Sequence, residues 1–202
     1  MNLNIFKFNS KNRNEIRAAV LKSVNVLKSG GIVVHPTDTC YGIAADINNK
    51  RAIDKVYKFK GRGFNNPLFI IVKDISQFKK YGCWDSAVGK LIRENPNKMF
   101  TFVVDRKKAV PAFLNPNFET IGIQMPKNDF SLTLLKKFKS PLIGTSANLS
   151  NQPVNYSIKD LLSQLAKKRT LPDLILDAGK LPLREPSSVV KFEKGKVIFL
   201  RK

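Results

Sequence analysis

Three short polar segments of the sequence carry the residue types best suited to chemistry. Residues 36–42 (PTDTCYG) follow a predicted strand and offer hydroxyls and backbone amides that could hold a small polar substrate. Residues 58–63 (KFKGRG) set cations around a glycine, which allows close approach to phosphates. Residues 144–150 (GTSANLS) offer small side chains suited to a phosphate or a ribose. Each segment can also be read as a turn or a solvated loop, so no single one settles a function.

The scarcity of histidine and cysteine excludes several classes of site. His35 is the only histidine, and Cys40 and Cys83 are the only cysteines. A zinc finger, a His-rich metal site and a disulfide framework are therefore not expected. Ser146 lacks a G-x-S-x-G turn, which argues against a hydrolase, and no phosphate-binding P-loop or dinucleotide fingerprint is present. We expect Cys40 to be a small buried thiol that packs.

The charge of the chain is strongly positive, with 36 Lys and Arg against 15 Asp and Glu and a net charge of +21. A charge this far from zero favours a polyanionic partner: RNA first, a membrane surface second and nucleotides third. The alternative interpretation is that the amino-acid composition as a whole is biased toward Lys and Asn. The charge alone does not choose between them.

Length and composition indicate one domain over residues 1–202. The hydrophobic fraction of 43% allows a real core. No apolar run approaches the roughly 20 residues that span a bilayer, and the first residues lack the apolar core of a signal peptide. We therefore expect a soluble, cytoplasmic protein.

Apolar periodicity predicts interleaved helices and strands, and hence an α/β fold with a twisted mixed sheet flanked by helices. Ser10 is the expected N-cap of the first helix, and Gly30 and Gly31 its stop. The expected helices cover 11–28, a short stretch after 48, 84–93, 129–138 and a stretch that begins at Ser157. The expected strands cover 5–8, 31–35, 67–72, 100–104, 121–125, 141–144, 174–176, 188–192 and 196–200. Ligands of such sheets bind beyond the carboxyl ends of strands, where the first and third polar segments lie.

Taken together and in order, these segments resemble the YrdC/TsaC family of threonylcarbamoyl-AMP synthases. The matching elements are PTDTCYG, then KGR with NPL at 66–68, then SANLS, and near the C-terminus DAG (177–179), SSVV (187–190) and the terminal Leu200-Arg201. The likeness extends over about residues 15–202 and fits the short, single-domain form. It implies a YrdC-like fold.

The sequence departs from the family pattern at several places. Gly63 stands where the family usually has proline, and Ile71 where a histidine is common. Residues 95–98 (NPNK) replace a Trp-Pro-Gly-Pro segment, and Asn151 replaces a glycine. Gln124 stands where an arginine is expected, which removes a cation from the implied ligand site.

The resemblance implies a nucleotidyltransferase that condenses L-threonine, bicarbonate and ATP to threonylcarbamoyl-AMP and pyrophosphate. The product would feed modification of the tRNA adenosine beside the anticodon through downstream partner proteins. Magnesium would accompany the ATP phosphates, with no protein-ligated metal. The implied threonine contacts are Thr37, Thr39, Tyr41, Ser146 and Ser187 or Ser188. The implied catalytic cations are Lys60 and Arg62, which also bind the nucleotide with Thr101, Asn148 and Arg201.

Two alternatives remain open at this point. The first is a double-stranded RNA or tRNA-binding module of the same fold with reduced or lost catalysis. The second is a carbamoyl-handling domain like those of hydrogenase maturation factors, which is disfavoured because those domains belong to much longer chains.

Overall fold

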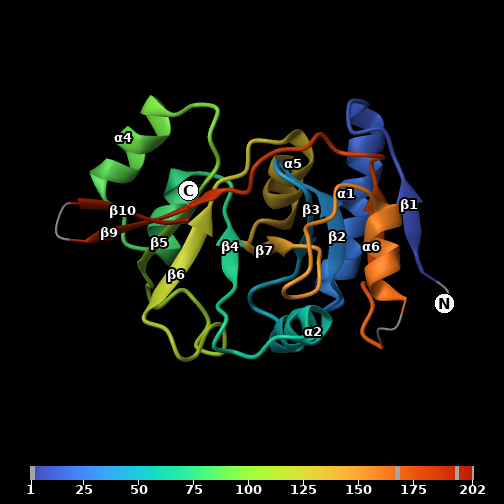
Figure 1. Cartoon of the computed structure of the whole chain (residues 1–202), viewed down its shortest axis with the longest axis horizontal. Coiled ribbons are helices and arrows are strands. Elements are labelled where there is room, and N and C mark those ends of the chain that lie inside the picture. Colours follow the sequence, from blue (N-terminus) through green and yellow to red (C-terminus); the bar gives the residue numbers. More distant parts are fainter. Residues whose placement is uncertain (1–2, 167–168, 194–195, 202) are drawn as a thin grey trace.

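The computed structural model describes residues 3–166, 169–193 and 196–201, which form one mixed β-sheet with helices on both faces (Figure 1). The strands are β1 (Ile5–Lys7), β2 (Val33–Pro36), β3 (Tyr41–Ala44), β4 (Phe69–Ile71), β5 (Phe100–Asp105), β6 (Thr120–Gln124), β7 (Leu142–Ser146), β8 (Leu174–Asp177), β9 (Ser188–Glu193) and β10 (Lys196–Arg201). The helices are α1 (Arg13–Lys28), α2 (Lys50–Lys60), α3 (Ile75–Tyr81), α4 (Ser86–Glu94), α5 (Asp129–Phe138) and α6 (Ile158–Leu165).

The sheet has ten strands in the order β1-β8-β2-β3-β7-β4-β6-β5-β9-β10. The pairs β1–β8, β2–β8, β4–β6 and β5–β9 are parallel, and the remaining pairs are antiparallel. The predicted α/β class with a mixed sheet is confirmed.

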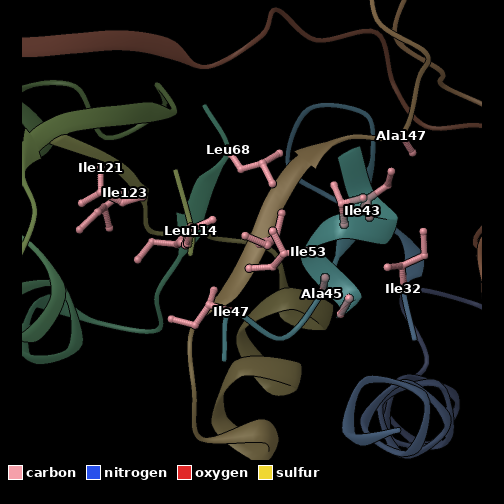
Figure 2. Close-up of a cluster of buried hydrophobic side chains, with 14 of the residues drawn as sticks. Ile32, Ile43, Ala45, Ile47, Ile53, Leu68, Leu114, Ile121, Ile123 and Ala147 are labelled. Atoms are coloured by element: carbon pink, nitrogen blue, oxygen red, sulfur yellow. The ribbon is translucent and has the colours of Figure 1, made fainter. Parts of the chain in front are cut away.

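Two apolar cores lie on opposite faces of the sheet. Buried side chains of α1 and α5 pack against Val33, Leu142 and Leu174 on one face. On the other face, the larger core joins α2 and α6 to the central strands, and Figure 2 shows Ile53 of α2 among the isoleucines of this core. Full burial of such a side chain contributes roughly 1.5–3 kcal/mol, so these cores hold the strands that carry the polar segments.

Most helix boundaries follow their capping residues. Ser157 accepts a hydrogen bond from the Asp160 amide at 3.1 Å, as the expected cap of α6. Helix α1 is capped by Asn12, whose side chain accepts from two amides of the first turn, and the prediction of Ser10 is wrong. Gly30, with φ of 80°, follows the end of α1 as expected. Two elements were not predicted: α3, which is only seven residues long, and β3, which directly continues the PTDTC turn.

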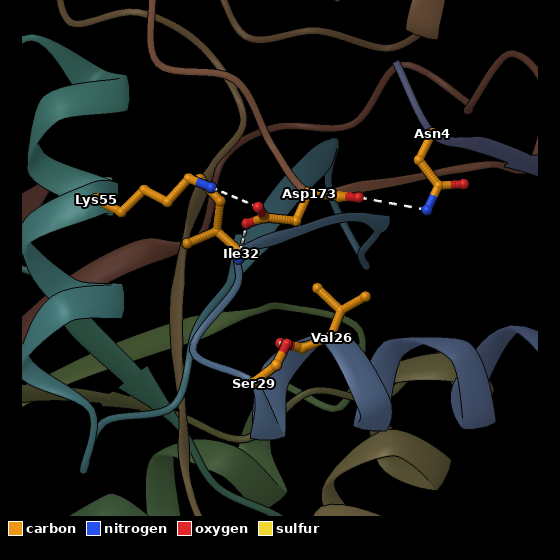
Figure 3. Close-up of polar contacts among 6 residues, drawn as sticks. All are labelled: Asn4, Val26, Ser29, Ile32, Lys55 and Asp173. Carbon is orange, nitrogen blue, oxygen red and sulfur yellow. Dashed lines mark hydrogen bonds and ion pairs between the residues drawn. The ribbon is translucent and has the colours of Figure 1, made fainter. Parts of the chain in front are cut away.

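Asp173 ties the start of β2 to helix α2 and to the N-terminal segment (Figure 3). Its carboxylate accepts from Lys55 Nζ at 2.5 Å and from the Ile32 amide at 2.7 Å. Its carbonyl accepts from Asn4 Nδ2 at 3.4 Å. These contacts fix α2 against the sheet, and α2 delivers the second polar segment.

Candidate active site

A single large cavity gathers side chains from all three polar segments. It has a volume of about 740 Å³, within the range typical of small-ligand sites. Thr37, Thr39, Lys60, Arg62, Ser146 and Asn148 all line it, together with Thr101, Ser187 and Arg201 from strands farther along the sheet. The sheet order explains the gathering, because β3 pairs with β7 and places the first and third segments side by side.

The floor of the cavity is a face of the sheet where side chains are small. In β5, Phe100 and Phe102 point into the larger core while Thr101 and Val103 line the cavity, as the period of two requires. Gly122 and Gly144 both lie opposite Phe69 of β4 in the pairing register. A Cβ on Gly144 would lie 2.5 Å from Ile71 Cγ2, so a side chain there cannot be added without displacing the floor.

Lys60 is the last residue of α2 rather than part of a loop, and its side chain is only 4% exposed. Its Nζ donates to the Ser146 carbonyl at 2.8 Å, to Asn148 Oδ1 at 2.9 Å and to Ser146 Oγ at 3.4 Å. Burial, with a smaller contribution from the charge of Arg62, lowers the pKa of Lys60 to about 7. An anion in the cavity would offset that cost and restore the full ammonium charge.

Three buried polar side-chain atoms lack a hydrogen-bond partner among the residues that the structure describes: Arg62 Nε, Ser131 Oγ and Ser150 Oγ. All three belong to residues that line this cavity. Burial also lowers the pKa of the Arg62 guanidinium. Unsatisfied buried donors cost about 1–3 kcal/mol each, and they concentrate where a bound ligand would supply the partners.

A second polar group lies across the cavity floor. Thr101 Oγ1 and Ser187 Oγ are 3.0 Å apart, and both side chains are buried. Arg201 donates to the Ser187 carbonyl at 2.7 Å from Nη2 and at 3.1 Å from Nε. These contacts hold the guanidinium of Arg201, on the last described strand, at the cavity.

The first segment forms a tight turn at the opposite wall. Thr37 Oγ1 donates to the Cys40 carbonyl at 2.7 Å and accepts from the amides of Thr39 and Cys40. Its hydroxyl therefore serves the turn, and its methyl group lies next to the position that a Cβ on Gly42 would take. Cys40 is 6% exposed, and burial raises the pKa of its thiol, as expected of a packing cysteine.

Two expected site residues do not line the cavity. The Tyr41 hydroxyl donates to the Gly179 carbonyl at 2.7 Å and accepts from the Ala178 amide at 2.9 Å, so it anchors the DAG segment instead. Burial raises the pKa of Tyr41 to about 12. Ser187 and Val189 line the cavity whereas Ser188, between them, does not, in keeping with the alternation of an extended strand.

The charge that lines the cavity is mostly positive. Lys60, Arg62, Arg184 and Arg201 line it, and Asp38 is the only carboxylate that the described residues contribute to the lining. Within the described part of the chain, no group of three or more His, Cys, Asp or Glu side chains could hold a metal ion. The positive lining of the cavity suits an anionic ligand.

No helix among the described residues has the length and apolarity to cross a membrane.

Arg184 is a lining residue that the sequence did not reveal. It lies in residues 178–187, which run as an extended segment from β8 to β9 across the top of the view in Figure 1. Its Nη1 donates to the Asp38 carbonyl at 3.2 Å, and its own carbonyl accepts from the Tyr156 hydroxyl at 2.9 Å. No periodic pattern marks this segment, so only the fold brings Arg184 to the site.

Four of the five departures from the family pattern lie at the cavity. Gly63, Ile71, Gln124 and Asn151 all line it. Asn151 has φ of 63°, a left-handed conformation that asparagine adopts more readily than most residues. Residues 95–98 lie outside the lining, where the carbonyls of Pro96 and Lys98 accept from Lys127 Nζ.

The burial of His35 predicts that the protein loses stability in acid. Burial lowers its pKa to about 4, against weaker raising effects of the hydrogen bond to the Pro36 carbonyl and of the charge of Asp38. The unfolded chain therefore binds more protons than the folded one between pH 6.5 and 4, so stability falls as the pH drops through this window. We expect that His35→Leu removes about 2 kcal/mol of the stability lost between pH 7 and pH 5, measured by denaturant unfolding at both pH values. An equal loss in both proteins would contradict a buried neutral His35.

Comparison with known proteins decides the family. A family model for Sua5/YciO/YrdC proteins, described as telomere recombination, matches residues 25–202. The chain belongs to this family. The resemblance read from the motifs is thereby confirmed.

Relatives and solved structures of this family support the assignment. A putative threonylcarbamoyl-AMP synthase of Methanocaldococcus jannaschii is 30% identical over 98% of this chain and 91% of its own length. The mouse threonylcarbamoyl-AMP synthase is 32% identical over 82% of this chain and 56% of its own length. The structure of P. abyssi Sua5 complexed with L-threonine matches with a TM-score of 0.82 at 24% identity, over 98% of this chain and 56% of that one. The chain thus spans little more than half of these last two proteins.

Proposed function

We propose that this chain is a threonylcarbamoyl-AMP synthase, which joins L-threonine, bicarbonate and ATP and releases pyrophosphate. The observation that carries the proposal is the cavity itself: four cationic side chains line it, as do the three residues that have a buried polar side-chain atom without a partner in the described part of the chain. The relatives named for this activity, and the Sua5 structure with L-threonine, support it.

The reaction needs positioning and charge neutralisation more than a strong base. The threonine amine and bicarbonate first give an N-carboxylate and water. An oxygen of this carboxylate then attacks the α-phosphorus of ATP, and the bond to pyrophosphate breaks. The N-carboxylate is short-lived in water, so a walled cavity that holds both partners in line is the main requirement.

The residues divide between contacts to the nucleotide and contacts to threonine. Lys60 and Arg62 hold the triphosphate and stabilise the charge that develops on the leaving pyrophosphate. Thr101, Asn148 and Arg201 contact the nucleotide, while Thr39, Ser146 and Ser187 contact the threonine and its carbamate. The two ligands meet at the hydrogen-bonded pairs Thr101–Ser187 and Ser146–Asn148. Tyr41 supports the threonine contacts from outside the cavity by anchoring the DAG segment. Ser188 has no contact role in this arrangement.

Magnesium would accompany ATP as a counter-ion of its phosphates. Asp38 is the only carboxylate that lines the cavity in the described ranges, and its Oδ2 already accepts from the Lys127 amide and Asn128 Nδ2, both at 3.0 Å. The residues present therefore do not form a protein cage for the ion. The chain itself supplies cations to the phosphates.

Leaving out one substrate at a time tests the proposed reaction. Pyrophosphate release should require L-threonine, bicarbonate and ATP together, and should stop when any one is left out. Release that continues without threonine or without bicarbonate would mean that the cavity hydrolyses or transfers nucleotides in another way.

RNA binding is a second candidate function. A second groove, beside α2, favours it. It is lined by Lys50, Arg51, Asp54, Lys55, Lys58 and by residues 169–173. Lys50 pairs with Asp54 at 2.8 Å and Lys55 pairs with Asp173 at 2.5 Å. Arg51, Lys58 and Arg169 have no acidic partner among the described residues, and they are the cations left for phosphates.

We expect that a triple change of Arg51, Lys58 and Arg169 to Glu weakens binding of a duplex RNA by at least about tenfold and lowers the salt dependence. The matched control changes Lys11, Arg17 and Lys28 to Glu, which alters the net charge equally on the α1 side. Filter binding at several salt concentrations distinguishes them. Equal losses in both proteins would assign the binding to overall charge and not to the groove.

A further inference from the structure

A small polar corner of the cavity lies above Gly42, where β2, β3 and the start of α5 meet. Gly42 pairs with His35 in the sheet, and a Cβ built on it would lie 3.9 Å from His35 Nε2 and 2.6 Å from Thr37 Cγ2. The Thr37 methyl group therefore lies directly over Gly42, which has no side chain to exclude it, and His35 and Thr37 border the adjoining space of the cavity. His35, Thr37, Gly42 and Ser131 all line the cavity.

His35 presents a hydrogen-bond acceptor to this space. Its Nδ1 lies 3.0 Å from the Pro36 carbonyl oxygen, which can only accept, so Nδ1 carries the proton. In the neutral ring Nε2 is then a bare acceptor, and no described residue donates to it. The ring is 1% exposed and lies against Phe130, with centroids 5.5 Å apart.

Ser131 supplies the matching donor. It follows Phe130 on α5, is 1% exposed, and its Oγ has no hydrogen-bond partner among the residues with a described position. Its amide donates to Asn128 Oδ1 at 2.8 Å, and Asn128 Nδ2 in turn donates to Asp38 Oδ2. These bonds hold the first turn of α5 against the 36–42 turn and so keep Ser131 at the same corner as Thr37.

An acceptor, a donor and a methyl wall are the three features needed to recognise a secondary alcohol. A hydroxyl can donate to His35 Nε2 while it accepts from Ser131 Oγ, which satisfies two groups that otherwise remain unpaired. The Thr37 methyl group can contact a methyl on the same carbon. An anionic group fits less well, because the imidazole is neutral and the charge of Asp38 acts on it.

We propose that this corner recognises the side chain of the amino-acid substrate. His35 and Ser131 bind its β-hydroxyl, and Thr37 contacts its methyl group. The inference rests on the proposed function and deepens it: it names the residues that distinguish threonine from valine, which lacks the hydroxyl, and from serine, which lacks the methyl. A site built to bond a hydroxyl discriminates strongly against the analogue without it, because its own polar groups are left unpaired.

The test compares kcat/KM for pyrophosphate release with L-threonine, L-serine and L-valine, each with bicarbonate and ATP. His35→Leu and Ser131→Ala should each lower the threonine-to-valine ratio by about tenfold or more, mainly through a higher KM for threonine. His35→Gln can place an amide oxygen near the position of Nε2 and should restore part of the ratio. Ser131→Ala removes only an unpartnered oxygen, so its Tm should stay the same or rise.

Ser23→Ala is the matched control, since it removes an equally buried serine hydroxyl from α1, far from the cavity. Its threonine-to-valine ratio should equal that of the unaltered protein. Unchanged ratios in folded His35→Leu and Ser131→Ala, with threonine turnover intact, would overturn the inference and leave the proposed function standing. No turnover of any amino acid by the unaltered protein would overturn both.

Discussion

Lys60→Ala should lower the rate of pyrophosphate release by about 10²-fold or more, the usual scale for the loss of one charge-stabilising contact in a transition state. Lys60 is the buried cation that joins the second and third polar segments, through its bonds to the Ser146 carbonyl and Asn148 Oδ1. The loss should appear in kcat as well as kcat/KM, because charge on the leaving group develops only during the reaction.

The control for Lys60 is Lys137→Ala, which removes an exposed lysine from the last turn of α5. It should leave the rate unchanged. Thermal unfolding of both variants separates a catalytic loss from a folding defect. A Lys60→Ala enzyme that keeps its fold and works within a few-fold of the unaltered protein would remove Lys60 from the mechanism.

The lowered pKa of Lys60 adds a pH dependence to the same prediction. In the empty cavity the pKa is about 7, and bound phosphates should raise it. Below pH 7 the ammonium is already charged, so Lys60 adds no pH dependence to the ATP affinity there. Above pH 7 binding must take up a proton, so affinity should fall as the pH rises, and calorimetry in buffers of different ionisation enthalpy should detect the uptake. Lys60→Arg should lack this dependence.

Arg62→Ala has the second largest expected effect, again about 10²-fold in the rate of pyrophosphate release. Its buried Nε has no partner among the described residues, and its Nη2 makes only a long contact of 3.5 Å to the Pro67 carbonyl. The guanidinium is therefore held at the cavity with donors to spare, which suits bidentate binding of a phosphate. Arg62→Lys should recover only part of the rate, because a point charge replaces the fork.

Arg93→Ala, at an exposed position on α4, is the control for loss of an arginine charge, and its rate should match that of the unaltered protein. Steady-state kinetics with ATP varied at saturating threonine make the comparison. Normal turnover by Arg62→Ala would show that the unpartnered Nε serves no phosphate.

The sequence predicted the parts of the fold that have a local signal. Apolar runs located nine of the ten strands, and the Ser157 cap located α6. Strand β3 was missed because its four residues follow a turn without a break, and α3 because seven residues carry little periodicity. The Gly61 that ends α2, with φ of 64°, was a readable sign that Lys60 belongs to the helix and not to a loop.

The site was predictable where motifs cluster and hidden where the fold alone brings residues together. The three segments meet because β3 pairs with β7 and because Lys60 of α2 bonds to Ser146 and Asn148. The resemblance to the family implied a shared site for these segments. Arg184 and Ser131 come from an irregular segment and from a helix face, and neither has a local signature of function. The unpartnered Ser131 Oγ is visible only after every hydrogen bond around it is known.

The central claim is that this cavity builds an adenylate that carries both threonine and bicarbonate carbon. The most direct test incubates the protein with ATP, L-threonine and carbon-13 bicarbonate and identifies the adenylate by mass spectrometry. We predict threonylcarbamoyl-AMP that carries the label, formed together with pyrophosphate. Pyrophosphate accompanied by an unlabelled adenylate, or by no adenylate at all, would contradict the account.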